Sequence, residues 1–519
     1  MFEFPLLAHH SDCAAPMKPK VQDAVQASAV VEAVTDTDVV SRSSTNATES
    51  EETTRVPIYT INGTGEQTMY SEQSTYETRQ AAMSAFSLLE EDTRPSHRDG
   101  YQRKHGNQGS NSPIWRNHKK HFFILSAAGK PIYTRYGDET KLSSFMGVIQ
   151  VVIAYFSDEG DTLRSIRAGD HLFVFQTCGP LHLVAVSCTG ENEYQLRCQL
   201  DMLFNQIAMT LTVLQLDRIF EQRVNYDLRN LLSGTEKFMD TLATSFQRDS
   251  SVFLESIQSS HVPMRIRDRV TQTLLSSLPP KQLLFGMLFA KDRLITLLRP
   301  RNYTLHPKDV LLLHNMILSS SAFRTVESWT PVCLPHFNHH GFLHAYVCFI
   351  TPDLCLALLS AEKDAFFVHS DYKGRVVTAL TTLGVVPELD ASLPILGFSV
   401  LEMSVPGLRH CIVKSRTLGQ FVEPLPIAPY TRSQDLKRLR RLYQYGLELC
   451  TRKLSSHRMA CFTTGKETVV CQTSDTTEIY AAFGPLARKD VVLSGLQELR
   501  RWARNNEESL FMNTAPLLH

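Results

Sequence analysis

One order of predicted elements recurs three times after residue 119: a hairpin of two strands, a helix, three strands and a second helix. The strands are short apolar runs bounded by turn residues, and the helices show apolar residues at helical spacing. The copies share this pattern without a residue-level repeat. A unit with this order predicts a five-stranded antiparallel sheet with its helices packed on the faces, which is an α+β architecture. The chain is therefore expected to fold into three such units in tandem.

The pattern also sets the expected boundaries of the chain's parts. A long helix, about Glu191–Leu231, is expected to close the first unit, and the connecting helices are expected to end in a basic linker, Arg265–Arg269. The parts are a disordered tail over 1–115, a first unit over 119–232, a helical connector over 233–282, a second unit over 283–390 and a third unit over 398–519.

The tail has a composition typical of disorder. Residues 1–115 are rich in Ser, Thr and acidic residues, and they offer too little apolar surface to order themselves. One segment differs, since Met83, Phe86 and Leu89 have helical spacing within Tyr76–Glu91. That segment is either a short recognition helix that folds on binding or a chance apolar cluster.

The helix that follows the first hairpin, about Glu139–Phe156, is apolar on two sides. One side is expected to pack on the sheet of its own unit, and it consists of Leu142, Phe145, Ile149, Val152 and Phe156. A helix that is apolar nearly all round is buried nearly all round, so the other side needs a cover. That cover is either another domain of the same chain or a partner subunit. The candidate contact residues are Phe145, Met146, Val148, Val151 and Tyr155.

This part of the sequence also resembles a known family. The segments KKHFFILSAAGKPIYTRYGDE, LSSFMGVIQVVIAYF and FVFQTCGPLHLVAVS are similar to the Mon family of vacuolar fusion proteins, also called SAND. The resemblance runs from about Lys119 to the C-terminus. The order ββαβββα is the longin order, and the family is known for three longin domains in tandem. Pattern and resemblance therefore agree on the fold.

The resemblance implies a function that no motif could supply. It implies a guanine-nucleotide exchange factor for a late-endosomal Rab GTPase, active as a heterodimer with a CCZ-type longin subunit and recruited by an early-endosomal Rab. Such a factor would drive early-to-late endosome conversion and fusion with the lysosome or vacuole. The expectation is that the first longin domain pairs with that of the partner and that the GTPase lies across the pair. The alternative is a non-catalytic trafficking adaptor that binds active Rab and phosphoinositide.

The search for covalent chemistry finds little. Gly129-Lys130 and Gly465-Lys466 are predicted turns, because they lack the remaining residues of a phosphate-binding loop. Neither a nucleophile elbow nor a zinc-binding HExxH helix is present. The best metal lookalike is a histidine cluster without acidic or cysteine neighbours, so a solvated loop is the simpler interpretation. It consists of His336, His339, His340 and His344. No catalytic residue, metal or cofactor is predicted.

One helix is both amphipathic and basic. Within Ser433–Cys450, an apolar stripe is flanked by Lys437, Arg438, Arg440 and Arg441. A basic amphipathic helix either lies on an anionic membrane or packs on its sheet with its charges in water. These four bases are the candidates for contact with phosphoinositide headgroups.

Composition and charge exclude some partners and favour a compartment. The formal net charge of the 519 residues is +0, so no overall field attracts nucleic acid. The 11 cysteines show no metal-binding spacing, and several lie in apolar runs, which suits a reducing compartment. With no signal peptide or membrane span in view, the expectation is a cytosolic chain recruited peripherally to endosomal and lysosomal membranes.

Overall fold

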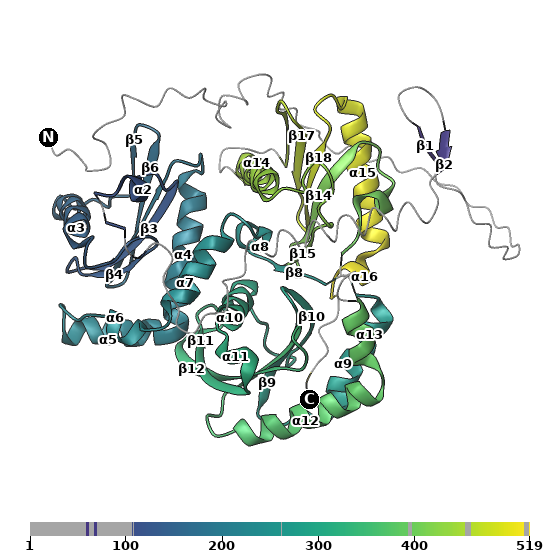
Figure 1. The fold of residues 1–519 in the computed structure, drawn as a ribbon, viewed down its shortest axis with the longest axis horizontal. Helices are drawn as coiled ribbons and strands as arrows, with labels where there is room; N and C mark the ends of the chain where they lie inside the picture. The colour runs from purple at the N-terminus through teal and green to yellow at the C-terminus, as the bar shows by residue number, and fades with distance from the viewer. Residues whose placement is uncertain are drawn as a thin grey trace, which may run out of the picture.

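A computed structural model describes residues 111–512 apart from 261, 393–396 and 452–457, together with 59–61, 67–69, 106, 108, 109 and Leu518. Three sheets, each flanked by helices, follow one another along the chain (Figure 1). The expected tail lies largely outside the described residues, as does its segment Tyr76–Glu91. Within it, the strands β1 (Tyr59–Ile61) and β2 (Gln67–Met69) pair antiparallel.

The first domain has the expected order and an antiparallel sheet ordered β4-β3-β7-β6-β5. Helix α3 covers one face of this sheet and helix α4 covers the other. The elements are α2 (Pro113–Arg116), β3 (Lys120–Ser126), β4 (Pro131–Thr134), α3 (Ser143–Asp158), β5 (Ser165–Ala168), β6 (His171–Cys178), β7 (Leu181–Ser187) and α4 (Glu193–Leu211).

Strand β3 shows why the sequence reads as a continuous apolar run. Phe123 and Leu125 point into the cluster under α3, whereas Phe122 and Ile124 point into the cluster under α4. Successive side chains of a strand face opposite sides of a sheet, so a strand covered on both faces needs apolar residues at every position.

The predicted long helix over Glu191–Leu231 is wrong, because it is broken at Thr212. The backbone of Thr212 takes φ 54° and ψ 150°, and its N–H donates to Ala208 O at 2.9 Å. Its side-chain oxygen then accepts from Gln215 N at 3.2 Å and starts the next helix. Apolar periodicity continues across the break, so the pattern gave no sign of it. The two helices that follow are α5 (Val213–Gln222) and α6 (Arg229–Leu232).

The connector is helical as expected, but it does not end in a basic linker. Arg265 and Arg269 lie in a helix, and Arg267 between them is buried. A short strand, β8, also crosses this region. The connector elements are α7 (Glu236–Ser245), α8 (Ser250–Leu254), β8 (Ile257–Gln258) and α9 (Met264–Ser276).

The second domain repeats the longin order with a sheet ordered β10-β9-β13-β12-β11. Two additional short helices, α11 and α13, follow its main helices. The elements are β9 (Leu283–Ala290), β10 (Arg293–Leu298), α10 (Pro307–Ser319), α11 (Ala322–Thr325), β11 (Ser328–Leu334), β12 (Asn338–Phe349), β13 (Leu354–Ser360), α12 (Phe366–Thr382) and α13 (Val385–Ser392).

The third domain has the same order, and its sheet gains a sixth strand from the connector. The order is β16-β17-β18-β14-β15-β8, with β8 parallel to β15. The elements are η2 (Val400–Met403), β14 (Leu408–Ser415), β15 (Gln420–Val422), α14 (Ser433–Thr451), β16 (Met459–Thr463), β17 (Thr468–Thr473), β18 (Thr477–Phe483), α15 (Lys489–Asn505) and α16 (Glu507–Leu510).

The first and second domains share one apolar core. Its largest cluster joins α4 and α7 to α10 and to the inner face of the second sheet. Polar contacts cross the same boundary: Asn315 donates to Gln206 Oε1 and to Phe238 O, both at 2.9 Å. Lys308 lies 2.9 Å from Glu255 Oε1 and 3.6 Å from Asp201 Oδ2. These contacts fix the two domains to each other.

Candidate functional site

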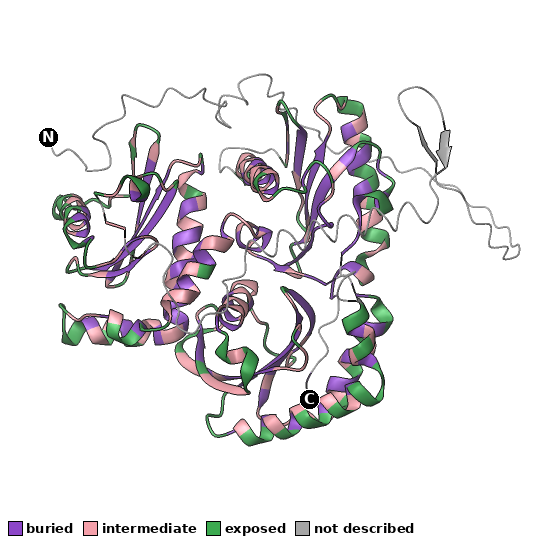
Figure 2. Cartoon of the chain, viewed as in Figure 1, coloured by how far each residue is buried: buried purple, intermediate pink, exposed green. Residues whose placement is uncertain are grey.

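The helix after the hairpin occupies the same place in all three domains, yet its outer side differs. No residue of α10 from Pro307 to Ser319 is exposed, and none of α14 is exposed from Leu436 to Cys450. The rest of the chain covers the outer sides of both helices. Helix α3, at the outer edge of the first domain, keeps an exposed side (Figure 2).

The exposed side of α3 is apolar. Val148, Val151 and Tyr155 are 37%, 67% and 65% exposed, and we call these three residues the α3 stripe. Residues three and four apart on a helix lie on one side of it, so the three form a continuous row. Apolar side chains gathered in this way on a surface mark an interaction site more often than scattered ones do.

Two of the predicted contact residues lie elsewhere. Phe145 and Met146 are buried in the core of the first domain, where the Phe145 ring lies 5.2 Å from Phe123. They share a side with Leu142 and Ile149, and that side faces the sheet. The prediction of direct contact through Phe145 and Met146 is therefore corrected: these residues support α3 from beneath.

The α3 stripe could have been covered by another domain of the same chain. Its three residues remain exposed with the described parts of all three domains in place. Within that part of the chain, the intramolecular alternative therefore does not hold for Val148, Val151 and Tyr155. A cover from outside the described residues remains as the candidate explanation.

Sequence reasoning missed the support that α2 gives to α3. Trp115 is buried against Phe145, with ring centroids 5.8 Å apart, and its Nε1 donates to Tyr136 O at 3.0 Å. His121 beside it is also enclosed, and burial lowers its pKa to about 3, so the ring is neutral at pH 7. The sequence signal for this short helix was Pro113, because proline favours the first position of a helix, followed by the apolar Trp115 in a polar stretch.

Strand β5 lies at the sheet edge next to α3. Its described sheet partner is β6, and Ile166 and Ala168 pack against the same cluster as α3. An edge strand presents unpaired backbone N–H and C=O groups, which another strand can pair with. Strand β5 thus contributes to the same core cluster as α3.

Two of the four basic residues of helix α14, Arg438 and Arg440, form ion pairs within the protein. Arg438 donates to Asp435 Oδ1 at 2.7 Å and lies 3.1 Å from the buried carboxylate of Glu467. Arg440 donates to Ser250 Oγ at 3.0 Å and pairs with Glu423 at 3.2 Å. Burial alone would raise the pKa of Glu423, but Arg440 and His410 together lower it to about 2.

The other two bases of this helix are also only partly exposed. Lys437 is half-buried. Burial is the main reason why the pKa of Lys120 in the first domain is lowered, and the nearby positive charge of Arg441 lowers it further. The prediction of a membrane patch is therefore corrected for Arg438 and Arg440, and for Lys437 and Arg441 it stays a prediction. The connector packs over α14, which sequence periodicity could not show.

The histidine cluster is spread over separate contacts. His336 is hydrogen-bonded to the buried Asp309 at 3.0 Å and stacks on His306, whereas His344 stacks on Trp329. In the described ranges, no group of three or more His, Cys, Asp or Glu residues is placed to hold a metal ion. No helix among these residues is long and apolar enough to cross a membrane.

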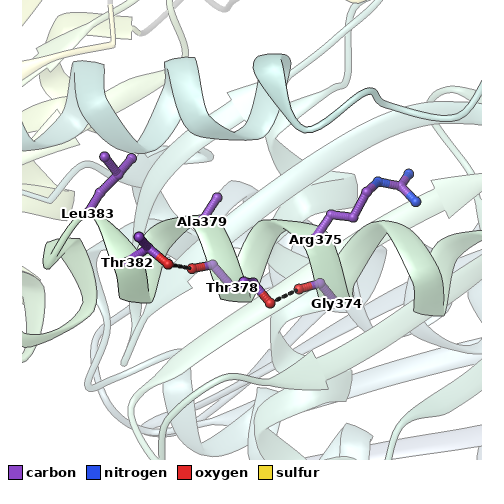
Figure 3. Close-up of a pocket in the computed structure, with 6 residues that line it drawn as sticks. All are labelled: Gly374, Arg375, Thr378, Ala379, Thr382 and Leu383. Carbon is purple, nitrogen blue, oxygen red and sulfur yellow. Dashed lines mark hydrogen bonds between the residues drawn. The ribbon is translucent and has the colours of Figure 1, made fainter.

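A shallow hollow on the outer side of α12 offers little chemistry (Figure 3). The hydroxyls of Thr378 and Thr382 donate to the carbonyls of Gly374 and Thr378, both at 2.8 Å, along their own helix. Arg375 donates to Ser277 O and Leu278 O instead. The polar groups around the hollow are thus already hydrogen-bonded within the protein.

Comparisons with known proteins agree with this architecture. Three family profiles match, described as the first, second and third longin domains of FUZ, MON1 and HPS1, over residues 120–242, 281–378 and 407–507. "Vacuolar fusion protein MON1 homolog A" of Gallus gallus is 39% identical over 77% of this chain and 73% of its own length. The protein of the same name in Homo sapiens is 38% identical over 79% of this chain and 63% of its own length.

A third relative has the family's other name. "Protein SAND" of Takifugu rubripes is 37% identical over 77% of this chain and 77% of its own length. The three profiles match the three longin domains in order, and the relatives match most of the chain. Both comparisons indicate the same family. The chain belongs to the MON1 family of vacuolar fusion proteins, also called SAND.

Proposed function

We propose that this chain is one subunit of a heterodimeric guanine-nucleotide exchange factor for a late-endosomal Rab GTPase. In this proposal its first longin domain pairs with that of a CCZ-type subunit, and the GTPase lies across the pair. The observation that supports it is the α3 stripe, because α3 alone of the three equivalent helices keeps an exposed apolar side. The name of the Gallus gallus relative, a vacuolar fusion protein, supports a role in vacuolar fusion.

The α3 stripe and the β5 edge have complementary uses in such a pairing. A large aromatic such as Tyr155 at the centre of an interface provides much of the binding free energy. The β5 edge can add main-chain hydrogen bonds to the partner's sheet. A stable interface buries roughly 1,200–2,000 Å² in total, more than three side chains provide, so helix and edge strand are both needed.

Exchange activity would require no covalent chemistry. Nanomolar to picomolar nucleotide binding corresponds to about 12–16 kcal/mol, and micromolar binding to about 8 kcal/mol. A factor that prefers the nucleotide-free GTPase must therefore supply several kcal/mol of differential binding, since only differential affinity shifts a population. A paired apolar platform can supply this through contacts alone. Recruitment by an early-endosomal Rab and by a phosphoinositide surface completes the proposal, and no lipid-binding residues are assigned.

Release of fluorescent GDP from the late-endosomal Rab tests this function. It should be measured with this chain alone, the CCZ-type subunit alone, and the two co-purified. The proposal predicts acceleration by the pair and by neither subunit alone. Tight binding of the GTP-bound Rab without any acceleration would contradict exchange activity and would favour the adaptor.

A further inference from the structure

The end of the chain crosses the boundary between the third and second domains. Leu510 and Phe511 are buried in the core of the third domain. Met512, the next residue, belongs to the core shared by the first and second domains, and Leu518 belongs to a second-domain cluster. We call residues 507–512 together with Leu518 the C-terminal strap.

Backbone hydrogen bonds hold the strap at both ends. Gln420 of β15 accepts from Met512 N at 2.9 Å and donates to Met512 O at 3.3 Å. Leu518 N donates to Arg299 O, just after β10, at 2.9 Å. The strap is thus fixed to strand β15 of the third sheet and to the end of β10 in the second domain.

Arg267 of α9 is the central contact of the strap. It is only 6% exposed, and its guanidinium donates to Phe511 O at 3.0 Å, Ser509 O at 3.2 Å and Glu508 O at 3.3 Å. It also donates to Ser260 O at 2.7 Å, next to β8. No carboxylate among the described residues forms an ion pair with it. Its charge is therefore stabilised by carbonyl oxygens, three of which belong to the strap.

The remaining contacts at this boundary are few. Ile257 and Gln258 of β8 pair with Gln420 and Phe421, and Ser259 bridges to Leu294 of the second domain. The turn before β15 also touches α10, because a Cβ built on Gly419 would lie 2.4 Å from Pro307 Cγ. Helix α8 of the connector also packs on α14 of the third domain, through Leu254 and the hydrogen bond from Arg440 to Ser250 Oγ. Apart from that packing and the strap, two residues of strand pairing and one turn contact join the second and third domains.

We infer that the C-terminal strap is a latch that fixes the third longin domain to the second, with Arg267 as its anchor. With the latch closed, the three domains behave as one body. With the strap released, the third domain keeps its own sheet and core but opens along β8. This inference does not depend on the proposed exchange activity.

Hydrogen exchange on the full-length chain tests the latch. Arg267→Ala is compared with Arg265→Ala, a matched arginine of the same helix that is 79% exposed and contacts Glu388. A hydrogen bond to a charged group corresponds to about a tenfold change in an equilibrium. We therefore expect exchange at 256–260 and 507–512 to rise at least about tenfold in Arg267→Ala. Exchange in β17 and β18 should stay unchanged, and Arg265→Ala should match the wild type throughout.

Arg267→Lys is the deciding variant if Arg267→Ala does not fold. Lysine keeps the charge but has three donors in place of five, so it cannot reach all four carbonyls. The latch predicts the same pattern with a smaller rise. Two results would overturn it: wild-type exchange at the boundary, or a rise of equal size in β17 and β18, which would show that Arg267 supports the whole third domain.

Discussion

At the scale of single residues, the ion pair between Glu423 and Arg440 shows how burial changes the role of a charge. Arg440→Met should destabilise the protein by about 3–5 kcal/mol, because Glu423 would remain buried without its strongest partner. Urea unfolding at pH 7 measures this loss. Arg416→Met, which removes a more exposed arginine, is the control and should cost about 1 kcal/mol or less.

The same carboxylate should make stability depend on pH. The pKa of Glu423 is about 2 in the fold against about 4.5 ordinarily, so its stabilising effect is full above pH 4.5 and is lost as pH falls toward 2. The shift corresponds to about 3 kcal/mol. The difference between the unfolding free energies at pH 7 and at pH 3 should therefore be smaller in Glu423→Gln than in the wild type. An equal acid loss in both proteins would contradict this.

Thr212 combines a helix break with backbone strain. Thr212→Ala keeps the left-handed φ but removes the oxygen that accepts from Gln215 N, so it should cost about 1 kcal/mol. Thr212→Gly also loses this contact, but it relieves roughly 1–2 kcal/mol of strain and should be at least as stable as the wild type. Chemical denaturation of the two variants separates the contribution of the helix cap from that of the backbone strain. If Thr212→Gly were less stable than the wild type, the backbone at Thr212 would not be strained.

Some of these residues were predictable and others were not. Helical spacing placed Val148, Val151 and Tyr155 on a separate side of their helix, and the structure leaves them exposed. Spacing could not reveal that Arg440 is covered, because its contacts Arg248 and Ser250 are far away in sequence. Local pattern reports which side of a helix is polar, but only tertiary packing decides whether that side meets water.

At the scale of elements, strand β5 makes the proposed pairing testable. Because Phe175 N donates to Arg164 O, alternate residues pair with β6, and the N–H of Arg167 points toward the open edge. Arg167→Pro should therefore weaken binding of the CCZ-type subunit about tenfold or more without loss of stability. Arg167→Ala keeps that N–H and should bind like the wild type. Equal binding by both variants would exclude strand addition at β5.

Element existence was largely predictable, but short elements were not. The sequence predicts strands at Ser328–Leu334 and Gln420–Val422, and β11 and β15 have these bounds. Helix α2 and strand β8 have four and two residues, too few to show any periodicity. These missed elements support α3 and join two domains, so the sequence is least informative at the contacts between units.

At the scale of the whole molecule, the three domains are not independent. Asn315 joins α10 to α4 and α7, so Asn315→Ala should destabilise the protein by about 1–3 kcal/mol. The first and second domains share their core and should still unfold in one transition. Calorimetry should show a lower but single transition for these two domains. A separate early transition for either would contradict the shared core.

This packing explains why α3 stands out. Helices α10 and α14 have apolar residues as α3 does, but other parts of the chain cover them. Three tandem units were predictable from the repeated order. Which unit leaves a helix side open was not, because that depends on how α4 and the connector pack between the units.

The affinity of the CCZ-type subunit for Val151→Asp tests the central claim most directly. Val326→Asp in the second domain is the matched control, since Val326 is 65% exposed and Val151 is 67% exposed. A charge buried in an apolar interface should weaken binding roughly 100-fold for Val151→Asp. The control should bind like the wild type, and both variants should keep wild-type stability. Unchanged binding by Val151→Asp would show that the α3 stripe is not the partner surface.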